Sequence, residues 1–84
     1  MTTEPTPTLR PLVLVTGATG YIGGRLVPQL LAAGFRVRVV TRQPRNLADR
    51  EWRHQVEIVQ GDAADPNAMM ETLQGVCVVY YLIH

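Results

Sequence analysis

Three glycines, spaced three residues apart, constrain the fold of this chain more than any other feature of its sequence. They lie at positions 17, 20 and 23 within the stretch VTGATGYIGG, residues 15–24. Residues 12–16 before them form a short β-branched run, which predicts a strand buried on both faces. Residues 21–33 after them repeat apolar side chains at intervals of three and four, which predicts a helix, and Gly34 stands where a left-handed C-cap belongs. The glycines therefore occupy a tight turn between a buried strand and a helix.

A turn of this kind has a physical use for each glycine. One glycine lets the chain turn sharply, a second lets the backbone approach a pyrophosphate, and a third lets the helix pack closely on the strand. The helix N-terminus adds unbonded N–H groups and a partial positive charge that suit phosphate oxygens. A glycine-rich turn can also be purely structural, but its place between strand and helix favours a dinucleotide site at Gly17, Gly20 and Gly23.

The alternation of strands and helices continues along the chain. The pattern predicts further strands at 36–41, 56–60 and 76–83, and a short helix around 47–53. Another helix begins at Asp65-Pro66, where Asp65 is interpreted as an N-cap rather than as half of a catalytic carboxylate pair with Asp62. We therefore predict an α/β domain of three-layer Rossmann type, with four parallel strands in the order 3-2-1-4 and helices on both faces.

The composition limits the other possibilities. A chain of 84 residues with a net charge of +1 holds one small domain and favours neither nucleic acid nor a membrane as partner. Its one cysteine, Cys77, excludes an internal disulfide and fits a cytoplasmic location, and we expect it to be a buried apolar residue of the last strand. Residues 1–11, rich in proline and threonine, are expected to form a disordered tail, and residues 12–84 the N-terminal half of a Rossmann domain.

The stretch TGATGYIGGRLV, with its TGxxGxxG spacing, resembles the extended and atypical short-chain dehydrogenase/reductases. The segments RVRVVTRQP, VEIVQGDAADP and VVYYLIH follow in the order of that family, especially of its epimerase/dehydratase-like and NmrA-like members. The resemblance spans residues 12–84. It implies that Asp62 contacts adenine, with Ala63 beside it, and that Leu82 and Ile83 lie along the adenosine and its ribose.

The end of the second strand bears on the choice of cofactor. An NAD-specific site needs a carboxylate there for the ribose hydroxyls, but the strand ends in Val40-Thr41-Arg42. A guanidinium at Arg42, helped by Arg45, suits a 2′-phosphate, so NADP is favoured over NAD. Arg36 and Arg38 open this strand on the side away from the cofactor and are expected to have no role in binding. The complete set of predicted cofactor-binding residues is Gly17, Thr19, Gly20, Tyr21, Ile22, Gly23, Arg42, Asp62, Ala63 and Leu82.

No catalytic residue is predicted. Members of the family that the chain resembles use a YxxxK pair on a later helix, or other groups in the C-terminal half that binds substrate, for redox chemistry. This chain has no such pair and no lysine. Three hypotheses stay open: the cofactor half of an oxidoreductase or epimerase-like enzyme, a non-enzymatic NmrA-like dinucleotide-binding redox sensor, and a vestigial truncated fold that binds nothing strongly. NADPH and NADH titrations separate the third from the first two.

The remaining candidates have ordinary structural interpretations. His54 and His84 lack a third ligand for a metal site, and Trp52, Met69 and Met70 are interpreted as helix packing. Tyr21 is interpreted as a helix-start residue near the phosphates rather than a proton donor.

The apolar strand at 76–83 is expected to form an exposed edge of the sheet. Such an edge invites self-association, so we predict a homodimer or a higher oligomer through this strand.

Overall fold

The structure is a computed structural model that describes residues 10–18 and 20–82. Thr19, Ile83, His84 and residues 1–9 of the expected tail lie outside the described residues. The elements are β1 (Leu12–Thr16), α1 (Tyr21–Ala32), β2 (Arg36–Thr41), the 3₁₀ helices η2 (Pro44–Leu47) and η3 (Glu51–Gln55), β3 (Glu57–Gln60), α2 (Pro66–Thr72) and β4 (Val76–Tyr81).

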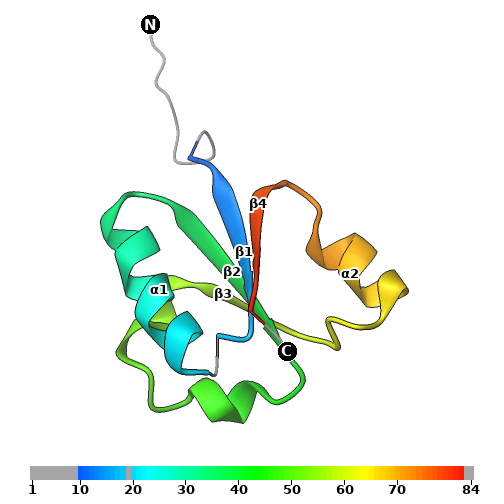
Figure 1. Cartoon of the computed structure of the whole chain (residues 1–84), viewed down its shortest axis with the longest axis horizontal. Coiled ribbons are helices and arrows are strands. Elements are labelled where there is room, and N and C mark those ends of the chain that lie inside the picture. Colours follow the sequence, from blue (N-terminus) through cyan, green and yellow to red (C-terminus); the bar gives the residue numbers. More distant parts are fainter. Residues whose placement is uncertain (1–9, 19, 83–84) are drawn as a thin grey trace, which may run out of the picture.

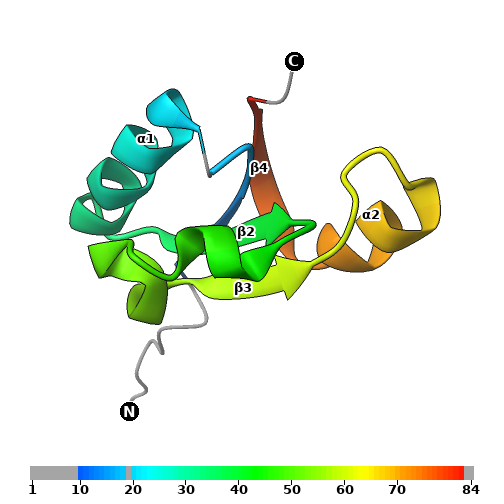
Figure 2. The same ribbon diagram turned by 90° about the horizontal axis from the view of Figure 1, so that it is seen from below.

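The strands form one parallel sheet in the order β3-β2-β1-β4. The helix α1 covers one face of the sheet and α2 the other, as Figure 1 and Figure 2 show from two directions. The predicted three-layer class and strand order are therefore confirmed. No helix in the described ranges is long and apolar enough to cross a membrane.

The core is built around β1, the strand that lies between β2 and β4. Every residue of β1 is buried, as its continuous apolar pattern predicts. On one face, Val13 and Val15 belong to the same buried cluster as Val27 and Leu30 of α1. Burying a side chain of this size stabilises the fold by about 1.5–3 kcal/mol. This packing fixes the carboxyl end of β1, from which the glycine turn begins.

The connection from α1 to β2 is equally well defined. Gly34 has a φ of +94°, and its N–H donates to the carbonyl of Leu31 at 3.0 Å, so the predicted left-handed C-cap is confirmed. Arg36 follows and holds the segment before β1. Its backbone N–H donates to the Pro11 carbonyl and its Nε to the Arg10 carbonyl, each at 3.1 Å.

The predicted helix around 47–53 is wrong in form, because the segment folds as the two 3₁₀ helices η2 and η3. Each of them contributes one apolar side chain to the core, Leu47 from η2 and Trp52 from η3. Positions five apart lie about 140° apart around a continuous α-helix and would not face the same core. Two separate 3₁₀ helices allow Leu47 and Trp52 to reach the same core. The predicted packing role of Trp52 is therefore confirmed.

The helix α2 is held at both ends by side chains. At its N-terminus the Asp65 carboxylate accepts from the N–H of Asn67 at 3.0 Å, which confirms the predicted cap. At its C-terminus Arg38 of β2 donates from Nη1 to the carbonyls of Thr72, at 2.6 Å, and Gln74, at 2.9 Å. The Arg38 Nε also pairs with the Glu57 carboxylate of β3 at 2.7 Å. Arg38 therefore joins two strands and a helix, a structural role that the sequence did not predict.

Two side chains expected in the interior are exposed. Met70 is 70% exposed, because it lies one position beyond the half-buried Met69 and points about 100° away around α2. Cys77 is also exposed. The residues beside it, Val76 and Val78, pair with consecutive residues of β1, so Cys77 is an extra residue in a register shift on an edge strand.

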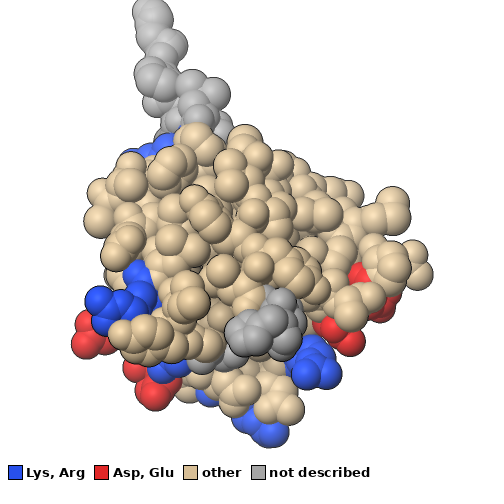
Figure 3. Space-filling model, in the orientation of Figure 1, with Lys and Arg blue, Asp and Glu red and all other residues tan. Residues whose placement is uncertain are grey.

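The strand β4 is the edge strand that the sequence predicts. Its only neighbour in the described sheet is β1, and Val78, Val79, Tyr80 and Tyr81 are all exposed. Figure 3 shows that the face over β4, between α1 and α2, is almost free of charged side chains, which gather along its rim. In the described sheet, β4 therefore forms an apolar, largely uncharged edge that no further strand covers.

Candidate functional site

The turn after β1 has the geometry that its glycines allow. Gly17 has a φ of +79°, a left-handed conformation that L side chains rarely adopt, and its carbonyl accepts from the N–H of Gly20 at 3.0 Å. This hydrogen bond closes a four-residue turn. The chain thus reverses within one turn and enters α1.

Gly23 lets α1 approach the turn closely. A Cβ built on Gly23 would overlap the carbonyl oxygen of Gly17 and lie 2.7 Å from the Cα of Ala18. Gly23 is buried and both of these neighbours are backbone atoms, so the space cannot open by a change of rotamer. The third glycine therefore serves close packing, as expected.

Gly20 has neither constraint. It is the N-cap residue of α1 with a φ of −83°, and a Cβ there would meet only the Gly17 carbonyl oxygen, at 3.4 Å. Within residues 10–18 and 20–82 no side chain caps the helix, and no acidic residue lies in its first turn. The positive end of the α1 dipole and its first N–H groups are therefore open to an anion from outside the chain.

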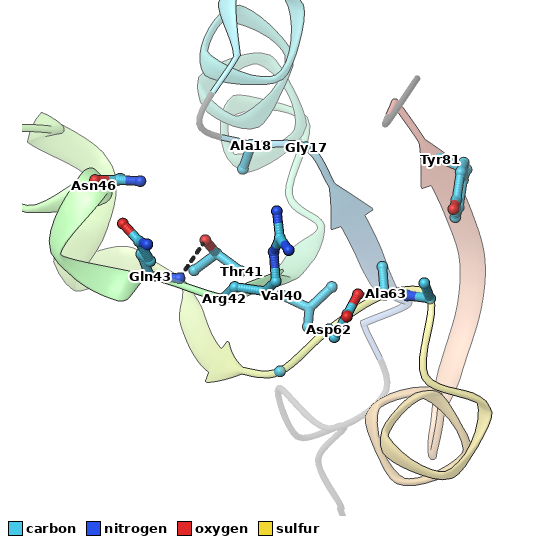
Figure 4. Close-up of a pocket in the computed structure, with 12 residues that line it drawn as sticks. Gly17, Ala18, Val40, Thr41, Arg42, Gln43, Asn46, Asp62, Ala63 and Tyr81 are labelled. Carbon is cyan, nitrogen blue, oxygen red and sulfur yellow. Dashed lines mark hydrogen bonds between the residues drawn. The ribbon is translucent and has the colours of Figure 1, made fainter.

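A pocket of about 550 Å³ lies beside this turn, where the carboxyl ends of the strands meet. Figure 4 shows its walls: the glycine turn above, the segment after β2 on one side, the segment after β3 below, and the end of β4 on the other side. Ligands of open parallel sheets bind at this edge. The lining residues are Gly17, Ala18, Val40, Thr41, Arg42, Gln43, Asn46, Gly61, Asp62, Ala63, Ala64 and Tyr81.

Arg42 is the basic residue of this pocket. Its exposed side chain rises from the end of β2 toward the glycine turn (Figure 4). In the part of the chain that the structure describes, its guanidinium has no hydrogen-bond or ion-pair partner. Two hydrogen bonds hold the backbone around Arg42. The Gln43 N–H donates to the Thr41 Oγ1 at 3.2 Å, and the Gln60 Nε2 donates to the Arg42 carbonyl at 3.4 Å.

Asp62 is the acidic residue of the pocket. Its Oδ1 accepts from the N–H of Ala64 at 2.9 Å, and its carbonyl accepts from the N–H of Asp65 at 2.9 Å. These two bonds make a compact turn that fixes the carboxylate at the pocket floor, next to Ala63 (Figure 4).

The predicted site residues are only partly brought together. Gly17, Arg42, Asp62 and Ala63 line the pocket, whereas Gly20, Tyr21, Ile22 and Gly23 form the adjoining start of α1 without lining it. Thr19 lies outside the described residues. Leu82 is half-buried against the core cluster, and Arg45 does not line the pocket.

Tyr21 and Ile22 are both exposed at the start of α1. Tyr21 is paired on its own helix, where the Nη1 of Arg25 donates to its hydroxyl at 3.3 Å and the guanidinium lies 5.5 Å from the ring centre. Among the described residues no group of three or more His, Cys, Asp or Glu could hold a metal ion.

Sequence reasoning missed several lining residues, chiefly Gln43, Asn46 and Tyr81. Gln43 and Asn46 follow β2 in an irregular segment, where no periodic pattern reveals which way a side chain points. Tyr81 could have been found, because it is the last residue of β4 and strand alternation places its side chain opposite to that of Tyr80.

The comparisons with known proteins agree with this geometry. The chain is 40% identical over 67 residues to the ceramide reductase of Caulobacter vibrioides, which covers 79% of this chain and 20% of that protein. A Rossmann-fold NAD(P)-binding family protein from Shigella flexneri superposes with a TM-score of 0.76 at 26% identity, over 87% of this chain and 37% of that one. A short-chain dehydrogenase/reductase superfamily protein from Agrobacterium tumefaciens, with bound NAD, superposes with a TM-score of 0.67 at 29% identity, over 86% and 20%.

The chain spans 20–23% of the length of the first curated relatives that it matches. The model of the NmrA-like family matches residues 10–84, which is nearly all of the sequence. With its glycine turn and its 3-2-1-4 parallel sheet, this chain belongs to the NmrA-like family and is a Rossmann module of the NAD(P)-binding type.

Proposed function

We propose that this chain holds NADP(H), in preference to NAD(H), at the carboxyl edge of its sheet. One observation about Arg42 carries the proposal. Its side chain lines the pocket beside the glycine turn, and its guanidinium has no partner among the described residues. The end of β2 carries no carboxylate to receive the ribose hydroxyls of NAD. A planar guanidinium at that place suits the 2′-phosphate that distinguishes NADP.

The pyrophosphate would lie over the turn that contains Gly17, Thr19 and Gly20, at the N-terminus of α1. The open space above Gly20 supports this placement, because no contact with the described residues requires a glycine there. Tyr21 and Ile22 begin the helix beside this turn, and Gly23 keeps the helix close enough to present its N–H groups.

The adenosine would lie over Asp62 and Ala63. Since the Asp62 Oδ1 accepts from the Ala64 N–H, Oδ2 is left to accept from an exocyclic amino group. Leu82, the residue that follows β4, would border the ribose.

Residues 12–84 would thus form the cofactor half of a larger cytoplasmic domain, and Arg36 would tie Arg10 and Pro11 of the expected tail to it. A bound NADPH would supply a hydride, whereas the residues of this chain supply binding and orientation. An oxidoreductase or epimerase activity would need acid–base groups beyond this chain, which has no lysine. The alternative is a redox sensor of the NmrA-like kind, for which the contrast between NADPH and NADP⁺ affinities matters more than catalysis.

Isothermal titration of the 84-residue chain with NADPH and with NADH tests this proposal. NADPH should bind more tightly, Gly20→Val should weaken both ligands, and Arg42→Gln should remove most of the preference. The matched control is Arg53→Gln, the same change at an exposed arginine of η3 that does not line the pocket. Tighter binding of NADH would overturn the role of Arg42, and no binding of either ligand would reject the function.

We also propose that the chain self-associates through β4. The support is its exposed apolar edge, because in the described sheet β4 pairs with β1 on one side and leaves the backbone groups of its other side without a strand partner. Sedimentation at micromolar concentration should show a dimer or larger species, and a clean monomer would remove the proposal.

A further inference from the structure

We infer that Tyr81 is an adenine-contacting residue of this site and that Thr16 is its positioning residue. The inference rests on the proposed dinucleotide function and extends it to two residues with no binding role so far. Tyr81 lines the pocket across from Arg42, at the end of a different strand (Figure 4).

Among the exposed residues Val78, Val79, Tyr80 and Tyr81 of β4, Tyr81 is the one that lines the pocket. It ends β4 with 58% of its surface exposed, and its side chain points from the end of the strand toward the loop that carries Asp62 and Ala63 (Figure 4). The rest of that loop offers the pocket only small or polar side chains. An aromatic face on one wall and a carboxylate on the floor suit a flat base with an exocyclic amino group, which stacks on the first and donates to the second.

The backbone on both sides of Tyr81 is fixed by a single buried hydroxyl. The Thr16 Oγ1 donates to the carbonyl of Tyr80 at 3.3 Å and accepts from the N–H of Leu82 at 3.1 Å. Thr16 is fully buried at the end of β1, and its own carbonyl also accepts from the Leu82 N–H at 3.3 Å. The residue between the two anchored peptide groups is Tyr81, so its side chain leaves the strand in a set direction.

Strand alternation supplies a matched control within the same strand. Tyr80 is the neighbouring tyrosine, is also exposed, and does not line the pocket. Tyr80→Ala and Tyr81→Ala therefore remove the same ring from the same edge strand, but only the second removes it from the pocket.

The probes are NADPH, adenosine 2′,5′-bisphosphate and nicotinamide mononucleotide, titrated into the full 84-residue chain. Tyr81→Ala should raise the Kd of NADPH and of the bisphosphate by about tenfold, as expected for one lost stacking contact. Tyr81→Phe and Tyr80→Ala should leave both within about twofold of the unchanged chain, because Phe keeps the stacking face. Nicotinamide mononucleotide binding should not change.

Thr16→Val should weaken the bisphosphate, and Thr16→Ser, which keeps the hydroxyl, should restore it. The effect of Thr16→Val should disappear in the Tyr81→Ala background, a coupling that a general loss of structure would not produce. If the unchanged chain binds NADPH and Tyr81→Ala binds it equally well, the inference fails while the proposed function stands. If the unchanged chain binds no NADPH, both fail.

Discussion

A Cβ at Gly23 would overlap the carbonyl oxygen of Gly17, which places the first turn of α1 in direct backbone contact with the end of β1. We expect Gly23→Ala to lower the free energy of unfolding by about 1–3 kcal/mol, because only backbone movement can relieve the overlap. Urea unfolding monitored by the fluorescence of Trp52 measures this change.

The matched control is Gly20→Ala, since a Cβ there meets nothing closer than 3.4 Å. It should cost at most about 1 kcal/mol, because alanine is a poorer N-cap than glycine. Equal losses from the two alanines would contradict the packing role of Gly23. The Gly20 variant also tests the site, since it should retain stability and bind NADPH less tightly.

The half-buried side chain of Arg38 should stabilise α2. Arg38→Met removes two hydrogen bonds to carbonyls at the end of α2 and the ion pair with Glu57. We expect a loss of about 1–3 kcal/mol, with faster amide hydrogen exchange in α2. Arg36→Met, which removes one side-chain bond to the Arg10 carbonyl, is the comparison and should cost less. Unchanged exchange in α2 would show that other contacts hold the helix.

Binding of NADPH should depend on salt more than binding of NADH. The Arg42 side chain is exposed, so its attraction to a 2′-phosphate is screened by added ions. Between about 0.05 and about 0.5 M NaCl the NADPH to NADH affinity ratio should fall by about fivefold. Calorimetric titrations at several salt concentrations measure this ratio. In Arg42→Gln the ratio should not respond to salt, and a salt-independent ratio in the unchanged chain would argue against a guanidinium–phosphate contact.

The reactivity of the Cys77 thiol should show whether the β4 edge is covered by another chain. Because the thiol is exposed, a thiol reagent should modify it in the native chain at a rate within about tenfold of that in urea. If β4 pairs with a second copy, the native rate should fall as the protein concentration rises, whereas the rate in urea should not. A native rate that is the same at low and high micromolar concentration would count against self-association through β4.

The parts of this molecule that follow from repeating patterns could be predicted from the sequence. The burial of β1, the turn at Gly17 and the Asp65 cap depend on residues close in sequence, and the strand order follows from the βαβ connections. The 3₁₀ helices could not be predicted, because Leu47 and Trp52 reach one core from positions five apart. Cys77 and Tyr81 depend on the register shift and the end of β4, which are set by pairing with β1 and not by local sequence.

The two edge strands of the sheet, β3 and β4, differ in length and in charge. The β3 edge is four residues long and carries Glu57, which is ion-paired with Arg38, and charged side chains on an edge strand discourage another strand from pairing there. The β4 edge offers six residues without a single charge. We therefore expect any strand that extends this sheet, from whichever source, to pair with β4 rather than with β3.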